Sequence, residues 1–428
     1  MFTGWAREYG DIVSWRTFHY RIYLLNHPDD IETILVTRSR SFHKGRGLQA
    51  NRELFGNGLL LSEGDFWLRQ RRLMQPAFSR ERISTYAASM ATHAAHMLAG
   101  WRDGETIDVH RELMRVALEI AGETLFGVSV GHEAERVSAA LRTLVEANTT
   151  AWRLMPLLRS LPTASNRRYS HAVAELHSVV ASIIARRHAS SPAKQAARDD
   201  LLARLLSAED ADGSRMNDTQ LRDECVTLLL AGHETTALAL TWTAYLLARH
   251  PDLQERFYLE AHSVLGDRTP APEDLQHMPF CDCVIRESLR LYPPAWLMPR
   301  LTIEDCEIRG YKIACGASVL VSPYVVHRDA RYFSEPDRFH PDRWSEAFAR
   351  SLPRFAYFPF GGGPRICIGN HFALLEAGLL LTMIIQRFRL EPADSAEIEP
   401  LPSITLRPKG PVRLKISRRS SPRYQTLP

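Results

Sequence analysis

Apolar positions recur at helical spacing along most of this chain. Between residues 64 and 150 they fall three or four apart, as at Leu113, Val116 and Ile120, which marks one buried face of a helix. Short runs rich in β-branched and aromatic residues, such as Arg21–Leu25, predict strands. Further helices are expected over residues 171–187, from 218 to 250, up to 291 and over 368–388, and further strands over 13–15, 311–313 and 318–321.

The longest periodic segment begins near Asp218 and ends at His250, because a proline disfavours helix in the residue before it. At 1.5 Å per residue this segment would span roughly 50 Å, enough to cross a whole domain. It is nearly all apolar over 226–247, yet the stretch 232–236 reads Gly-His-Glu-Thr-Thr. A polar cluster inside an apolar helix needs partners or a function.

These patterns predict the fold class. Helix dominates and the strands cluster near the two ends, so we expect a mainly α protein with small β-sheets (α+β), and not a doubly wound sheet. No linker or internal repeat divides the chain. One domain is therefore expected over residues 1–415, followed by a polar, flexible C-terminal tail over 416–428.

Composition and charge exclude several classes of protein. The 428 residues are 45% apolar with a net charge of +4, which lacks the concentrated basic face of a nucleic-acid binder. No run of apolar residues predicts a membrane span, and no signal peptide is found. Six cysteines without paired CxxC spacing argue against a disulfide framework or zinc site and favour the cytoplasm. The abrupt start at Met1 leaves a native N-terminus upstream open.

The most informative segment is the cysteine loop, residues 360–369, which reads Phe-Gly-Gly-Gly-Pro-Arg-Ile-Cys-Ile-Gly. Its glycines allow close approach of the backbone to a flat ligand. Cys367 precedes the expected last helix, whose N-terminus would stabilise a thiolate, and Arg365 offers a cation to a carboxylate. From the residues alone two interpretations remain open: a thiolate metal ligand, or an inert cysteine in a glycine-rich turn.

The fixed positions Phe360, Gly363, Arg365, Cys367 and Gly369 resemble the cysteine-ligand signature of the cytochrome P-450 superfamily, Phe-x-x-Gly-x-Arg-x-Cys-x-Gly. The resemblance implies a single-domain cytochrome P-450 fold with a long central helix over the haem. It implies heme b (iron protoporphyrin IX) as cofactor, with Cys367 as the sulfur ligand of the iron. A thiolate ligand pushes electron density to the iron and favours O–O cleavage.

Further segments resemble the haem contacts of that family. Trp67 and Arg71 look like its Trp-x-x-x-Arg pair, on one helix face and within reach of one haem propionate. Arg300 stands where the family places another propionate-binding arginine. With Arg365, these groups would supply enough donors for two carboxylates. A surface arginine packed on Trp67 is the alternative for the first pair.

The middle of the long helix resembles the oxygen-binding turn of the family. Gly232 and the threonine hydroxyls would loosen the helix locally. The resemblance implies that Thr235 holds the iron-bound dioxygen and its water, and that Glu234 relays protons from solvent. A solvated polar strip is the alternative, and the apolar flanks disfavour it.

The resemblance, which covers about residues 9–415, also includes a structural network. Glu287 and Arg290 match the family's Glu-x-x-Arg, and Arg343 follows in Phe-His-Pro-Asp-Arg-Trp as its usual third member. We expect this triad to lock the cysteine loop and to perform no chemistry.

The activity implied is insertion of one atom of O2 into a hydrophobic substrate, while the second atom leaves as water. No reductase segment is recognised, so electrons from NAD(P)H are expected through a ferredoxin-type or flavodoxin-type partner. Arg69, Arg72 and Arg80 lie near the expected haem face and are candidates for docking an acidic partner.

The substrate pocket is expected to be lined by residues 44–62, 150–180, 228–238 and 295–301. Large apolar side chains there imply a hydrophobic substrate of the terpenoid, carotenoid or fatty-acid class. A fatty acid would use a cation at the pocket mouth, for which Arg46 or Arg52 could serve. The expected lining residues are Leu59, Leu60, Leu61, Trp152, Met155, Leu229, Trp296, Leu297 and Met298.

Three alternatives come from other classes of function. A peroxide-driven peroxygenase is disfavoured, because such relatives tend to replace the acid and hydroxyl that Glu234 and Thr235 retain here. A non-catalytic haem sensor or carrier would have no use for that proton relay. A helical scaffold without a cofactor would purify as a colourless protein.

Overall fold

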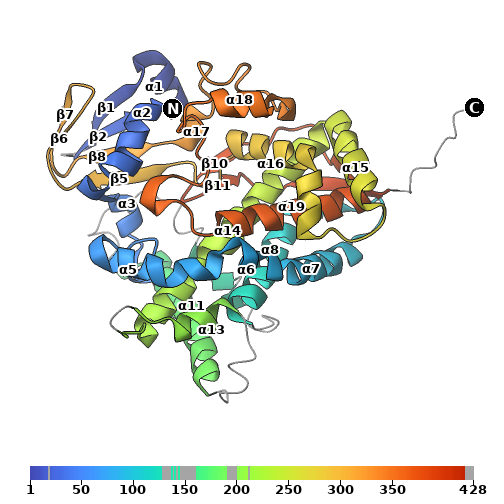
Figure 1. The fold of residues 1–428 in the computed structure, drawn as a ribbon, viewed down its shortest axis with the longest axis horizontal. Coiled ribbons are helices and arrows are strands. Elements are labelled where there is room, and N and C mark those ends of the chain that lie inside the picture. Colours follow the sequence, from blue (N-terminus) through green and yellow to red (C-terminus); the bar gives the residue numbers. More distant parts are fainter. Residues whose placement is uncertain are drawn as a thin grey trace, which may run out of the picture.

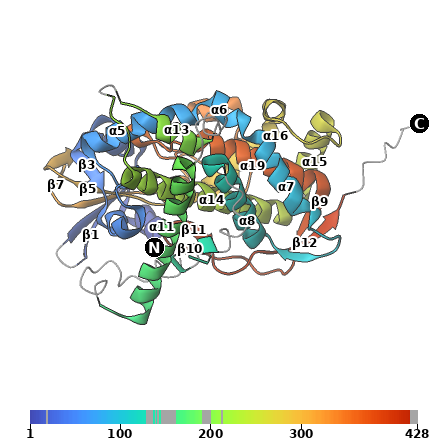
Figure 2. The same ribbon diagram turned by 90° about the horizontal axis from the view of Figure 1, so that it is seen from below.

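The computed structural model describes residues 1–17, 20–127, 136–137, 139–140, 143–144, 161–189, 200–210 and 213–419. Figures 1 and 2 show a helical body, with the largest sheet at one end and helices α7 (Ala87–Ala99) and α15 (Pro251–Leu265) at the other. The predicted class, mainly α with small sheets, is confirmed. Among these described residues, no helix is both long and apolar enough to cross a membrane.

The central helix α14 (Asp218–Arg249) passes through the middle of the body in both views. Asn217 and Gln220 close its start with a capping box, in which each side chain accepts the other residue's backbone N–H. The helix ends one residue before the predicted position. Its principal helical neighbours are α8 (Val109–Phe126), α11 (Ala164–His188), α16 (Pro279–Leu291) and α19 (Asn370–Arg387).

The described strands form small sheets, the largest in the order β1-β2-β8-β5-β3. Strand β2 is parallel to β8, and β3 is antiparallel to β5, with Lys44 opposite Arg300. This register brings two cations together from distant parts of the chain. The strands are β1 (Ile12–Thr17), β2 (Tyr20–Leu25), β3 (Phe42–Lys44), β4 (Thr106–Asp108), β5 (Met298–Thr302), β6 (Cys306–Ile308), β7 (Tyr311–Ile313), β8 (Ser318–Val321), β9 (Phe388–Pro392), β10 (Pro400–Pro402), β11 (Leu406–Pro408) and β12 (Arg413–Arg418).

Two apolar cores meet along α14. Its first half, to Leu230, belongs to a core shared with α8 and α11, and its second half, from Ala237, belongs to a core shared with α7, α15, α16 and α19. Residues 231–236 belong to neither core. The polar interruption seen in the sequence therefore lies at the junction of the two cores.

Two expected boundaries differ from those observed. The tail was expected from residue 416, but β12 pairs with β9 as far as Arg418, so 416–418 belong to the domain. Residues 420–428 lie outside the described residues. The helix expected over 171–187 begins at Ala164, because the Thr163 side chain accepts a backbone N–H and caps it.

Candidate functional site

The cysteine loop reaches the same junction as the middle of α14. Phe360 packs against one core and Ile368 against the other. The Cys367 side chain is exposed, and a Cβ atom added to Gly232 would meet no atom within 4 Å. Two elements that are far apart in the sequence therefore each border open space and each lie between the same two cores.

The backbone of the cysteine loop is tightly constrained. The Cys367 N–H donates to the Phe360 carbonyl at 3.0 Å, which closes the loop. Gly363 has φ +67°, and a Cβ atom there would lie 1.9 Å from the Leu35 carbonyl oxygen. Only glycine fits this position, because both the left-handed backbone and the contact exclude a side chain.

Cys367 is exposed, but protein atoms around its sulfur are dense enough to affect its ionisation. Burial raises the pKa of the thiol, while a backbone hydrogen bond from Gly369 and the charge of Arg71 lower it. Helix α19 begins at Asn370, with Gly369 at its N-cap. These groups favour negative charge on the sulfur, as a metal-bound thiolate requires.

A buried cluster of cations lies beside the loop. Arg300 is 8% exposed, and burial followed by the charge of Arg365 lowers its pKa to about 10. Burial and the charges of Arg300 and Arg365 lower the pKa of Lys44 well below its usual value. The carboxylate acting on these three groups is Glu63, which pairs with Arg365. The cluster is short of negative charge, so the two propionates of a haem fit it.

The two members of the predicted Trp67–Arg71 pair contact different parts of the site. Arg365 lies over the Trp67 ring, 4.3 Å from its centroid, and so joins this tryptophan to the cation cluster. Arg71 instead donates to the Ile366 carbonyl at 2.8 Å, beside Cys367. Trp67 thus lies with the propionate-binding candidates, whereas Arg71 lies near the sulfur.

The hydroxyls of α14 at the junction bond to their own helix. Thr235 donates to the Ala231 carbonyl at 2.6 Å, and Thr236 donates to the Gly232 carbonyl at 2.9 Å. Such bonds to the carbonyl four residues earlier weaken the regular ladder and help a helix to bend. Helix α14 nevertheless runs without interruption from Asp218 to Arg249, so the loosening expected from the sequence stays a prediction.

Glu234 turns toward the hairpin of β10 and β11. Its Oε1 accepts from Arg407 Nε at 2.9 Å and from Arg407 Nη2 at 2.5 Å, and it also accepts the Thr405 hydroxyl. All of these bonds end on one carboxylate oxygen. His110 of α8 is near enough for Arg407 and Glu234 to act on it, although burial is the main reason that its pKa falls to about 4.

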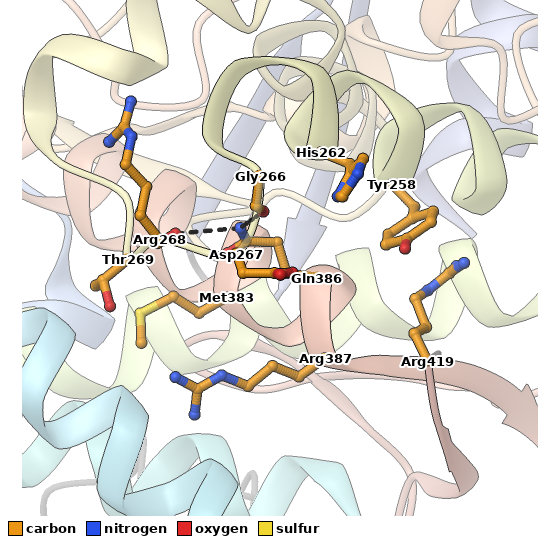
Figure 3. A pocket seen from close by; sticks show the side chains of 10 residues that line it. All are labelled: Tyr258, His262, Gly266, Asp267, Arg268, Thr269, Met383, Gln386, Arg387 and Arg419. Atoms are coloured by element: carbon orange, nitrogen blue, oxygen red, sulfur yellow. Dashed lines mark hydrogen bonds between the residues drawn. The ribbon is translucent and has the colours of Figure 1, made fainter. Parts of the chain in front are cut away.

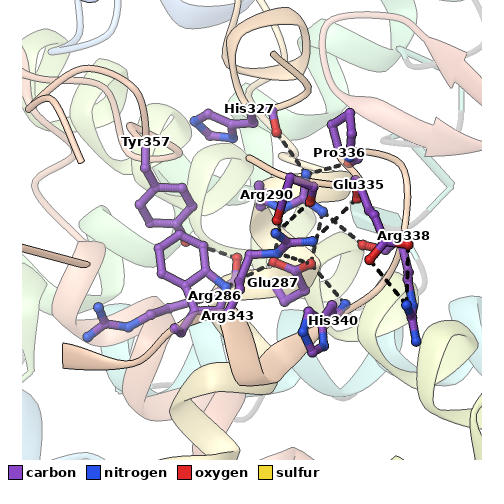
Figure 4. Close-up of polar contacts among 12 residues, drawn as sticks. Arg286, Glu287, Arg290, His327, Glu335, Pro336, Arg338, His340, Arg343 and Tyr357 are labelled. Atoms are coloured by element: carbon purple, nitrogen blue, oxygen red, sulfur yellow. Dashed lines mark hydrogen bonds and ion pairs between the residues drawn. The ribbon is translucent and has the colours of Figure 1, made fainter. Parts of the chain in front are cut away.

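The predicted triad of Glu287, Arg290 and Arg343 is assembled (Figure 4). Arg290 Nε and Nη2 donate to the two Glu287 oxygens at 2.8 and 2.9 Å, and Arg343 Nε donates at 2.9 Å. Trp344 Nε1 and the His340 N–H add bonds of 2.9 Å each. The network reaches toward the cysteine loop, since the Trp344 and Tyr357 rings lie 4.5 Å apart.

The cavity in Figure 3 lies away from this junction, between the C-terminal ends of α15 and α19. Two of its arginines are engaged: Arg268 pairs with Asp274 and Arg419 with Glu255. The Gln386 amide donates to the Gly266 and Arg268 carbonyls. These contacts satisfy polar groups at the C-terminal ends of the helices. The residues that line the cavity include none of the candidate site residues.

Some expected pocket and docking residues have other surroundings. The Trp296 indole donates to the Ser403 carbonyl at 2.8 Å and stacks on Phe2, and Leu297 packs with the N-terminal cluster. Arg69, expected on a docking surface, pairs with Asp210 at 2.9 Å. Leu59, Leu60, Leu61 and Leu229 do pack together in the core at the first half of α14, Met298 lies against Gly361, and Trp152 and Met155 lie outside the described residues.

Sequence reasoning missed several polar members of the site. Lys44, Glu63, Thr405 and Arg407 reach it only through the packing of distant elements, and no local motif marks them. Trp344 could have been found, because it directly follows Arg343 in the segment that supplied the triad.

Comparisons with known proteins agree with this geometry. Residues 1–416 match the family model described as Cytochrome P450. Cyclooctatin synthase of Streptomyces melanosporofaciens is 37% identical, over 95% of this chain and 88% of the relative. Pentalenene oxygenase of Streptomyces avermitilis is 35% identical, over 96% and 91%. A retinoic acid-bound cyanobacterial CYP120A1 structure has a TM-score of 0.88 at 26% identity, covering 97% of this chain and 93% of that one.

Proposed function

Because this chain belongs to the cytochrome P450 family and is a haem-b monooxygenase, we propose that Cys367 is the thiolate ligand of its haem iron. One observation carries the proposal: the cysteine loop and residues 231–236 of α14 border open space at the junction of the two cores. The cation cluster of Lys44, Arg300 and Arg365 beside the loop supports a haem held there by its propionates.

The residues around the sulfur have defined tasks in this proposal. Haem iron bound to a cysteine thiolate supplies the activation of O2, since electron donation from sulfur favours O–O cleavage. The Gly369 N–H and the Arg71 charge favour the ionised sulfur and so oppose burial, which raises the pKa of the Cys367 thiol. The Glu287 network holds the segment that precedes the cysteine loop in the position that Cys367 requires, through Trp344 and Tyr357.

In this proposal, proton transfer is assigned to two residues of α14. The Thr235 hydroxyl lies in the polar turn of α14 and can exchange its bond to the Ala231 carbonyl for one to a bound water or oxygen. Glu234 carries the proton to this hydroxyl. Its carboxylate is held through Oε1 by Arg407 and Thr405, so relay requires Oε2 or a rotation away from the hairpin.

Electrons reach bacterial members of this family from NAD(P)H through redox partners, and we propose a ferredoxin-type or flavodoxin-type donor. Arg72 and Arg80 are exposed and are the candidates for contact with an acidic partner. Arg69 is not part of this proposed surface, because its charge is already paired with Asp210.

A terpenoid is the substrate class that the observations favour. One relative is named a pentalenene oxygenase, and pentalenene is a cyclic terpene. A fatty acid needs a cation at the pocket mouth. Arg46 instead donates to the Gly316 carbonyl at 2.9 Å and lies over the Tyr20 ring, while Arg52 donates to Gln49.

The decisive experiment is the spectrum of the reduced, carbon-monoxide-treated protein. Cys367 as ligand requires the long-wavelength band of thiolate coordination in freshly prepared protein and its loss in Cys367→Ser. A histidine-type spectrum in the unmodified protein would sink the proposal. A screen by haem absorbance, with cyclic terpenes against fatty acids of equal carbon number, then tests the substrate class.

A further inference from the structure

Glu63 occupies a position at which three elements of the haem site meet. It is the N-cap residue of α5 (Gly64–Met74), the helix that carries Trp67 and Arg71. Its Oε1 accepts the backbone N–H of Lys44 at 2.5 Å, and its Oε2 pairs with Arg365 of the cysteine loop. Both side chains of this ion pair are largely buried, with 13% and 16% exposure for Arg365 and Glu63.

Arg365 is oriented by this carboxylate and by its immediate neighbours. Its Nη1 donates to the Ser62 carbonyl at 3.0 Å, and its guanidinium lies over Trp67. Ser62 and Glu63 therefore bind one edge of the guanidinium, and the Trp67 indole lies against its face. A guanidinium held in this way keeps its other edge in a fixed direction.

The charges of the cluster can be counted. The groups that act on Lys44 are Arg300 and Arg365, which disfavour its charge, and Glu63, which favours it. When all are ionised, three cations and one carboxylate leave a net charge of +2. Burial and the two arginines disfavour the Lys44 charge in the protein alone, and two propionates would favour it. With haem bound, the propionate charge of −2 is therefore balanced only when the Glu63 charge is included.

We propose that Glu63 is the charge-setting and positioning residue of the haem site: it orients Arg365 and limits the excess charge around the propionates to +2, and so lowers the haem reduction potential. The inference rests on the proposed haem position. Reduction adds one negative charge to the haem, which a nearby carboxylate opposes. At separations on the order of 10 Å, one charge changes such an equilibrium about two- to tenfold.

The test is a spectroelectrochemical titration of haem-loaded wild type, Glu63→Gln and Glu63→Asp. Glu63→Gln is expected to raise the ratio of reduced to oxidised haem at a fixed potential about two- to tenfold, where tenfold equals about 59 mV for one electron. Glu63→Asp keeps the charge and is expected to stay within about twofold of wild type. An unchanged or lowered ratio in haem-loaded Glu63→Gln would overturn the proposal, since a purely structural residue lowers the unfolding temperature without moving the potential.

A second variant decides the case in which Glu63→Gln takes up no haem. Glu63→Gln combined with Lys44→Gln leaves two arginines and no carboxylate, which restores +2. This double variant is expected to take up haem with a potential close to wild type, and failure to do so refutes charge setting. The carbon monoxide spectrum of the wild type separates this outcome from a failure of the Cys367 assignment, because it reports the axial ligand alone.

Discussion

Two carboxylates of this protein, Glu287 and Glu234, are both bound by arginines but in different ways. Glu287 is 0% exposed, and both of its oxygens accept bonds, from Arg290, Arg343, Trp344 and the His340 backbone. The Glu234 side chain is 15% exposed, and its bonds converge on one oxygen. Folding alone therefore supplies hydrogen-bond donors to both oxygens of Glu287. Glu234 keeps one oxygen for another partner, as a proton relay needs.

The largest expected effect comes from changing Glu287. Glu287→Gln removes the charge opposite two buried arginines, and an uncompensated buried charge costs about 3–5 kcal/mol. We expect a matching loss in the free energy of unfolding and little haem uptake, measured by denaturant titration and haem content. The control is Glu335→Gln, whose ion pair with Arg338 is 63% exposed on both sides, and it should change stability by less than about 1 kcal/mol. Equal effects of the two variants would contradict a structural role for Glu287.

Glu234, the proposed relay carboxylate, should show the reverse pattern. Glu234→Gln keeps the shape of the side chain and removes its proton-carrying charge, so product formation should fall about 10²-fold. Haem content and the thiolate spectrum should remain as in the wild type. Glu399→Gln is the matched control, because it also removes an ion pair near this hairpin, with Lys409. Normal product formation in Glu234→Gln would remove it from the relay.

A smaller effect is expected one residue along the helix. Thr235→Ala should divert electrons to hydrogen peroxide, with a rise of about tenfold in peroxide per product, less than the ~10²-fold typical of a lost general acid because water can partly replace the hydroxyl. Thr236→Ala removes the same type of bond to the helix but from a buried position. It should leave the peroxide yield near the wild-type level. If both variants leak peroxide equally, helix loosening and not the Thr235 hydroxyl is the cause.

The smallest effect is expected from His93, which contacts two carboxylates near the surface. His93 of α7 lies between Glu119 and Glu123 of α8, and its contacts with Glu119 first and then Glu123 raise its pKa above the ordinary 6.5. A raised folded pKa stabilises the protein fully below pH 6.5, and the contribution is lost as pH rises through the folded pKa. His93→Gln should therefore lower the free energy of unfolding by about 0.5–1 kcal/mol at pH 6 and by much less at pH 9. A difference that grows with pH would contradict this.

Local patterns in the sequence were sufficient for the helical class, for the span of α14 and for the members of the triad. They also identified the cysteine signature, since its residues are neighbours along the chain. Periodicity and short spacing carry this information because a helix face and a tight loop are built from residues close in sequence.

Partners across the fold were decided by tertiary structure alone. The Glu63 contact with Arg365, the Arg407 contact with Glu234 and the turn of Arg71 toward Ile366 each join distant elements. Such contacts depend on which strands pair and which helices pack. A charged side chain takes the best partner within reach once the backbone is placed, and the order of residues along the chain does not encode that partner locally.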